Sequence, residues 1–142
     1  MRIMGMDLGN KTLGVALSDP TGLICTGYPT IRFKNRDFET ALNEAMKFIK
    51  EHEVEKIVLG LPKNMDGTEG IQAETSRNFK KMLEDATGLE VILFDERLTS
   101  RIALDSMIMG GTNRQDRHDK IDEMAAKVIL QDYLDKIRRE NK

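Results

Sequence analysis

Asp7 is the first residue of the chain whose position could serve chemistry. It ends the apolar run of residues 3–6 and is followed by the turn-forming sequence Gly9-Asn10-Lys11. A carboxylate at that point is held at the rim of a sheet, and the nearby glycine leaves room for a phosphate or a metal ion to approach the backbone. An ordinary hairpin with a solvated aspartate has the same short pattern, so this segment alone favours the simpler interpretation.

A pair of acids, Asp95 and Glu96, follows the apolar residues 91–94. This run is apolar at successive positions, which predicts a central strand buried on both faces. Adjacent side chains on a strand point to opposite faces of the sheet, so only one of the two acids can share a site with Asp7. The other is expected to cap the following turn or to pair with an arginine. A strand end closed by salt bridges is the non-catalytic interpretation.

The third candidate is Asp122, near the start of a predicted C-terminal helix. It begins a helical stripe that comprises Asp122, Ala125, Ala126, Ile129 and Tyr133. The two alanines allow the helix to approach a sheet closely, and Asp122 would then face the sheet rim. A solvated acid at a helix start, favoured by the helix dipole, is the alternative. Asp119, three residues earlier, fits an additional metal ligand and a helix N-cap equally well.

Together these motifs put three carboxylates on separate elements that can converge at one end of a sheet. Like charges at short range repel, and a bound divalent cation removes that cost. Oxygen ligands without a Cys or His cluster suit Mg²⁺ or Mn²⁺ rather than zinc. Such ions can activate a water and stabilise the leaving oxygen in phosphodiester cleavage. The pattern therefore predicts a metal-dependent hydrolase.

The elements that would position these acids follow from periodicity and turn signals. Three strands come first, with Pro29 indicating an edge strand or a bulge, and strands then alternate with helices. This order predicts an α/β fold: a mixed five-stranded sheet, with three antiparallel leading strands and then parallel strands, and helices on both faces. The expected strands are 3–7, 12–18, 23–33, 56–61 and 90–94, and the expected helices are 37–52, 71–86 (ended by Gly88), one capped by Thr99, and 119–138, with a polar loop over 112–117.

Composition limits the class of protein. The chain has 142 residues, 39% of them hydrophobic and 32% charged, which predicts one globular domain over residues 1–142. The single cysteine, Cys25, forms no internal disulfide, fits a reducing cytoplasm and is expected to be a small buried hydrophobe. No apolar run has transmembrane length, and the N-terminus lacks a signal-peptide core. A net charge of −2 argues against binding nucleic acid by bulk positive charge, but local basic contacts remain compatible with it.

Four blocks of the sequence resemble the YqgF/RuvX family, whose members have an RNase H-like fold and are described as pre-16S rRNA nucleases and as Holliday junction resolvases. They follow one another over nearly the whole chain. Thr12 stands where the family often has arginine, so one phosphate contact is expected to be missing. The blocks are Gly5-Met6-Asp7-Leu8-Gly9 with residues 14–19, Gly60-Leu61-Pro62 with residues 65–68, residues 95–100, and Asp122 with Ala125-Ala126 and Ile129-Leu130-Gln131.

The resemblance implies a hydrolase of the endonuclease type, with Asp7, Glu96 and Asp122 as catalytic acids and metal ligands. Mg²⁺ or Mn²⁺ would be the cofactor, with a metal-activated water as the nucleophile. Asn64 and Thr68 are candidate substrate contacts in the loop 62–70, although turn formation and helix capping explain both. The candidate phosphate contacts are Lys11, Arg97, Arg101, Arg114, Arg117, His118 and Lys120; for any one of them, a solvated surface position is at least as good an explanation.

The expected substrate is precursor 16S rRNA, cut during processing of its 5′ end. A Holliday junction resolvase acting on branched DNA is the alternative, and the protein is expected to be a monomer or a homodimer that does not bind membranes. An actin-like ATPase shares the Asp-x-Gly opening, but it needs two such domains to enclose a nucleotide. A non-catalytic nucleic-acid-binding or ribosome-associated protein on the same scaffold is the alternative from another class.

Overall fold

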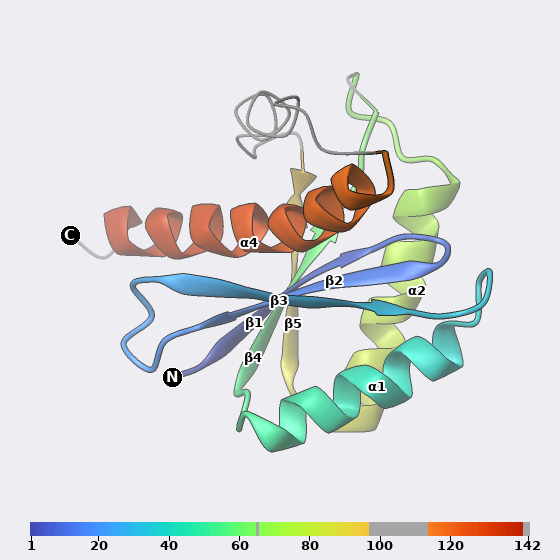
Figure 1. Cartoon of the computed structure of the whole chain (residues 1–142). Coiled ribbons are helices and arrows are strands. Elements are labelled where there is room, and N and C mark those ends of the chain that lie inside the picture. Colours follow the sequence, from blue (N-terminus) through green and yellow to red (C-terminus); the bar gives the residue numbers. More distant parts are fainter. Residues whose placement is uncertain (65, 97–113, 141–142) are drawn as a thin grey trace.

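The computed structural model of the chain describes residues 1–64, 66–96 and 114–140, with the side chains of the last stretch described from residue 124 onward. Figure 1 shows a single sheet with helices packed against it. The helix predicted to start at Thr99 lies outside the described residues. The elements are β1 (Ile3–Leu8), β2 (Thr12–Ser18), β3 (Cys25–Arg32), α1 (Phe38–Glu51), β4 (Lys56–Leu61), α2 (Ile71–Thr87), β5 (Glu90–Asp95) and α4 (Arg114–Glu140).

The sheet has five strands in the order β3-β2-β1-β4-β5. β1 pairs antiparallel with β2, and β2 pairs antiparallel with β3. β4 pairs parallel with both β1 and β5. This arrangement confirms the mixed five-stranded sheet predicted from the sequence. β3 is an edge strand whose register shifts opposite Leu13 and Val15, as the proline at position 29 indicated.

Most element boundaries agree with the periodicity. Asp37 caps α1 by accepting a hydrogen bond from the backbone N–H of Thr40, and Gly88 ends α2 in the left-handed conformation, with φ 71°. The start of α4 differs from the prediction. The helix includes Arg114, so residues 114–117 of the predicted polar loop are helical, and Asp119 lies inside the helix rather than at its N-cap. Residues 112 and 113 lie outside the described part of the chain. Polarity there indicated a loop, but residues 114–118 contain neither glycine nor proline to prevent a helix.

The helices cover opposite faces of the sheet. α4 crosses one face, whereas α1 and α2 pack on the other (Figure 1). Side chains alternate along β1: Met4, Met6 and Leu8 join the core under α1 and α2. Ile3 instead joins the core under α4. The face on which a strand residue lies therefore decides which helix it meets.

α4 is tied to the edge strand by Cys25. The Cys25 amide donates to Gln131 Oε1 at 3.2 Å, and its thiol donates to the Lys127 carbonyl oxygen at 3.3 Å. Burial raises the pKa of the Cys25 thiol to about 11. This cysteine is a packing residue, as the sequence indicated. In the described part of the chain, no helix combines the length and the apolar character that crossing a membrane requires.

A very close approach between α4 and the sheet occurs at Gly5. A Cβ added there would lie 2.7 Å from Leu130 Cβ and 3.0 Å from the Ala126 carbonyl oxygen. We expect Gly5→Ala to lower the free energy of unfolding by about 1–3 kcal/mol, because neither the backbone oxygen nor a Cβ atom can move aside without shifting the helix. Urea unfolding followed by circular dichroism measures this. An unchanged midpoint would mean that α4 does not pack this closely on β1.

Candidate active site

Asp7 lies near the end of β1 on the face covered by α4. It is two residues beyond Gly5, which touches α4, and its neighbours Met6 and Leu8 face the other side. Its partner in the antiparallel ladder is Gly14. Asp7 is half-buried, and it directly follows Met6, the last β1 residue that pairs with β4, so it belongs to a strand with neighbours on both sides. The carboxylate is therefore carried by a rigid central strand.

Glu96 follows β5 directly and lies on the same face as Asp7. Phe94, two residues earlier, packs in the core under α4. Glu96 is only 6% exposed, and its Cγ and Cδ each lie 3.2 Å from where a Cβ on Gly60 would be. Asp95 is the last residue of β5, paired with Leu61, and alternation places it on the opposite face.

One pocket contains both carboxylates. Its volume is about 210 Å³, and its lining comes from the turn after β1, the segment after β4, the end of β5 and the first turn of α2. Because β1, β4 and β5 run parallel, their carboxyl ends meet at one edge of the sheet, where open α/β sheets bind ligands. The lining residues are Asp7, Leu8, Gly9, Thr12, Pro62, Gln72 and Glu96.

The chemistry of this pocket suits a hard divalent cation. Two carboxylates, one of them almost fully buried, bring two negative charges into one small cavity, a cost that a cation removes. Carboxylate and hydroxyl oxygens are ligands that Mg²⁺ and Mn²⁺ accept. Among the described residues, no group of three or more Asp, Glu, His or Cys side chains is positioned to hold a metal ion. Asp122 belongs to α4, but its side chain is outside the described set.

Of the other predicted contacts, the three that the structure describes, Asn64, Thr68 and Lys11, do not line the pocket. Asn64 Nδ2 donates to Thr68 Oγ1 at 2.9 Å, and Thr68 also bonds Asp66, so this pair closes its own turn. Thr68 does not cap α2, whose N-cap is Gly70. Lys11 lies exposed in the β1–β2 turn. The side chains of Arg97, Arg101, Arg114, Arg117, His118, Asp119 and Lys120 lie outside the described set.

Sequence reasoning did not find Gln72. This residue lies in the first turn of α2, and its side-chain amide donates to Asn10 Oδ1 at 3.1 Å. The bond links the pocket wall to the turn that follows Asp7. No local pattern indicates such a role, because an exposed glutamine near a helix start is ordinary and its partner is 62 residues away.

Gly60 is a second residue whose role only the structure reveals. An alanine there would meet Ile129 Cδ1 at 2.7 Å as well as Glu96. We expect Gly60→Ala to weaken Mn²⁺ binding and to lower stability by about 1–3 kcal/mol. Thermal unfolding with and without Mn²⁺ measures both effects.

The double variant Gly60→Ala/Ile129→Val separates the two contacts. Valine lacks the Cδ1 atom that clashes, so stability should partly recover, while the pressure on Glu96 persists. Full recovery of the Mn²⁺-induced shift in the double variant would show that Gly60 affects the helix and not the carboxylate.

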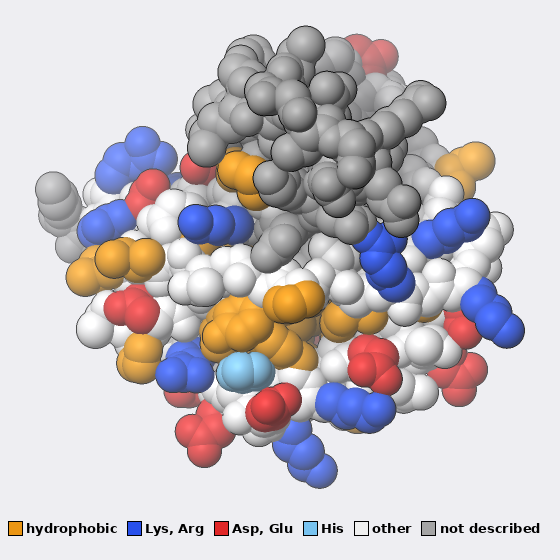
Figure 2. Space-filling model, in the orientation of Figure 1, with side chains coloured by type: hydrophobic (Ala, Val, Ile, Leu, Met, Phe, Trp, Pro, Cys, Tyr) orange, Lys and Arg blue, Asp and Glu red, His pale blue; other side chains and the backbone are white. Residues whose placement is uncertain are grey.

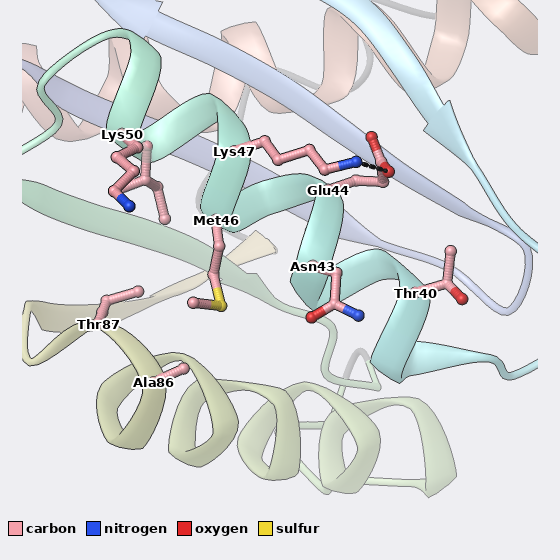
Figure 3. Close-up of a pocket in the computed structure, with 9 residues that line it drawn as sticks. Thr40, Asn43, Glu44, Met46, Lys47, Lys50, Ala86 and Thr87 are labelled. Carbon is pink, nitrogen blue, oxygen red and sulfur yellow. Dashed lines mark hydrogen bonds and ion pairs between the residues drawn. The ribbon is translucent and has the colours of Figure 1, made fainter.

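A larger cavity lies on the other side of the sheet. It has a volume of about 700 Å³ between α1 and α2 and is lined by Thr40, Asn43, Glu44, Met46, Lys47, Ile49, Lys50, Ala86 and Thr87 (Figure 3). Among the described residues that line it, the one acid is Glu44, which pairs with Lys47 at 3.0 Å. It therefore offers no converging carboxylates, and its size alone does not make it the reaction site.

Solved structures with the same architecture define the fold class. RuvC of T. thermophilus in complex with a Holliday junction substrate matches 100% of this chain and 97% of that one, with a TM-score of 0.63 at 10% identity. The fowlpox virus Holliday junction resolvase matches 96% and 99%, with a TM-score of 0.58 at 14% identity. The fold is the RNase H-like fold of RuvC-type resolvases.

Sequence similarity identifies the family. The family model described as "RuvX: Holliday junction resolvase" matches residues 1–136. A relative from Bacillus subtilis (strain 168) is 47% identical over 96% of this chain and 99% of its own length. One from Geobacillus sp. (strain WCH70) is 48% identical over 95% and 98%. Both carry the name "Putative pre-16S rRNA nuclease". The chain belongs to the RuvX family, as its motifs indicated.

Proposed function

We propose that this protein is a metal-dependent endonuclease that processes the 5′ end of precursor 16S rRNA in the cytoplasm. The observation that carries the proposal is the pocket at the carboxyl ends of three parallel strands, where Asp7 and Glu96 lie together. The choice of RNA follows the name shared by the relatives in Bacillus and Geobacillus. The family description favours branched DNA as the second candidate substrate.

In this proposal Asp7, Glu96 and Asp122 hold Mg²⁺ or Mn²⁺ at the sheet edge. The bound ion would supply a Lewis acid that activates water and stabilises the leaving oxygen of a phosphodiester. The chain itself contributes rigidity, since Asp7 is on a central strand and the carboxylate of Glu96 rests against Gly60. The Thr12 and Gln72 side chains offer polar contacts at the pocket wall.

The substrate is tested by incubating the purified protein with Mg²⁺ or Mn²⁺ against precursor 16S rRNA and a four-way DNA junction in parallel. We expect cleavage of the RNA near its mature 5′ end, and loss of cleavage when EDTA is added. Cleavage of the junction alone would transfer the function to branched DNA. Tight binding without cleavage of either substrate would favour a non-catalytic binding protein. The oligomeric state, monomer or homodimer, is measured on the same samples by light scattering.

Asp122 as the third ligand has a separate test. If its carboxylate joins the metal, Mn²⁺ should slow hydrogen exchange around residues 116–123 and change it little around residues 128–134, where α4 is already anchored by buried Ile129, Leu130 and Tyr133. Asp122→Asn should remove the Mn²⁺ effect. Equal protection in both segments, or none, would exclude Asp122 as a ligand.

A further inference from the structure

Arg36 lies in the loop between β3 and α1 in an unusual backbone conformation. Its φ is 60°, in the left-handed region that non-glycine residues seldom occupy. The strain is offset by a 2.7 Å hydrogen bond from its backbone N–H to the carbonyl oxygen of Asn10, in the turn that follows β1. The loop is thus hydrogen-bonded to the segment that borders the acid pocket, the cavity that contains Asp7 and Glu96.

The guanidinium of Arg36 is held by three further contacts. One nitrogen donates to Asn10 Oδ1 at 3.1 Å, and another donates to Oγ1 of the buried Thr75 at 3.2 Å. The group also stacks over the Phe38 ring, 5.2 Å from its centroid. Asn10 Oδ1 also accepts the hydrogen bond from the side-chain amide of Gln72, which lines the pocket. The orientation of the guanidinium is therefore coupled to the wall of the acid pocket.

Among the residues that the structure describes, no acid neutralises the charge of this arginine. Both side-chain hydrogen bonds go to neutral oxygens, and in the described part of the chain no carboxylate pairs with it. The neighbouring Asp37 is engaged as the α1 cap, accepting from Thr40. A cation that is exposed, oriented and without a counter-ion is preorganised for an anion.

Further basic residues lie in the segments next to Arg36. The β1–β2 turn and the β3–α1 loop lie side by side, because the Phe33 N–H donates to the Lys11 carbonyl oxygen at 3.0 Å. Figure 2 shows Lys and Arg side chains, with Asp and Glu side chains among them, on the side of the molecule where these two segments lie in Figure 1. Arg32 is the ladder partner of Thr12, which lines the pocket. The exposed cations of the two segments are Lys11, Arg32, Lys34 and Arg36.

We propose that Arg36 binds a backbone phosphate of the nucleic acid whose scissile bond lies at Asp7 and Glu96. The proposal rests on the proposed nuclease function and adds a substrate contact to it. Asn10 and Thr75 fix the guanidinium on one side and leave its exposed side to the phosphate. A phosphate contact does not depend on the base sequence. Its role would be to position the nucleic-acid strand relative to the two acids.

Three variants test the contact. Arg36→Gln removes the charge, and Arg36→Gly removes the whole side chain while suiting the left-handed backbone, so that the loop keeps its conformation. Arg139→Gln is the control, since it removes the same charge from an exposed position in the last turn of α4, far from the β1–β2 turn (Figure 1). The probe is a fluorescein-labelled RNA fragment spanning the 5′ end of precursor 16S rRNA, titrated in EDTA at several salt concentrations.

We expect both Arg36 variants to bind about tenfold more weakly, the effect of losing one charged contact, and the control to change less than about twofold. The slope of log affinity against log salt should shrink by about 0.7, the value for one phosphate on a single strand. With Mg²⁺, the KM for cleavage should rise while kcat stays nearly unchanged.

Equal binding by the Arg36 variants and the control would overturn the contact and leave the nuclease proposal intact. Weaker binding by the Arg36 variants, with no cleavage by the wild type, would keep the contact and overturn the nuclease. Failure of the wild type to bind the RNA would overturn the contact. Thermal unfolding of Arg36→Gly checks the fold, and a midpoint close to that of the wild type is expected.

Discussion

Asp7→Asn should lower the cleavage rate by about a thousandfold or more, a loss of about 4 kcal/mol in transition-state stabilisation. Asparagine preserves the size of the side chain but removes the charge that attracts a cation to the pocket. Single-turnover cleavage of precursor 16S rRNA at saturating Mg²⁺ measures the loss. Asp85→Asn is the matched control, because Asp85 is an exposed acid on α2 that does not line the pocket, and it should retain full activity.

The fold should survive this substitution. Asp7 and Glu96 share one pocket, so removing one charge relieves repulsion in the metal-free protein, and the unfolding midpoint should stay equal or rise. Mn²⁺ should raise the midpoint of the wild type more than that of Asp7→Asn, because only a ligand that binds the folded state stabilises it. Wild-type turnover by Asp7→Asn would remove this pocket as the reaction site.

Glu96→Gln should lose activity to a similar extent, about a thousandfold, whereas Asp95→Asn should stay within about threefold of the wild type. The two acids are adjacent in sequence, and the sheet separates them. Glu96 is buried in the pocket with Asp7, and Asp95 points to the opposite face. Each variant replaces one carboxylate by the corresponding amide. The chemical change is therefore the same in both, and the variants differ in the face of the sheet on which the acid lies.

The measurement is the same single-turnover assay, together with Mn²⁺-dependent thermal unfolding. Glu96→Gln should show a reduced Mn²⁺ shift, and Asp95→Asn a normal one. An inactive Asp95→Asn beside an active Glu96→Gln would mean that the end of β5 is turned by one residue relative to the pocket.

The sequence predicted most of the fold because its signals are local. Alternating and continuous apolar runs define all five strands, and Gly88 ends α2 where the periodicity stops. Pro29 indicated the edge strand because proline cannot donate to a ladder hydrogen bond. Local signals also explain why the predicted start of α4 was wrong. A polar segment without glycine or proline fits a loop and a helix equally well.

For the site, the local sequence indicates that Asp7 and one of two adjacent acids lie at the ends of apolar strands. It could not bring those strand ends together, because the neighbours in the sheet are decided by packing between residues far apart in the chain. Three contacts at or near the site are long-range. Glu96 packs against Gly60, the Gln72 amide donates to Asn10 at the pocket wall, and Arg36 donates to Thr75. These contacts become visible only in the folded chain, because each joins residues whose local sequences have no pattern in common.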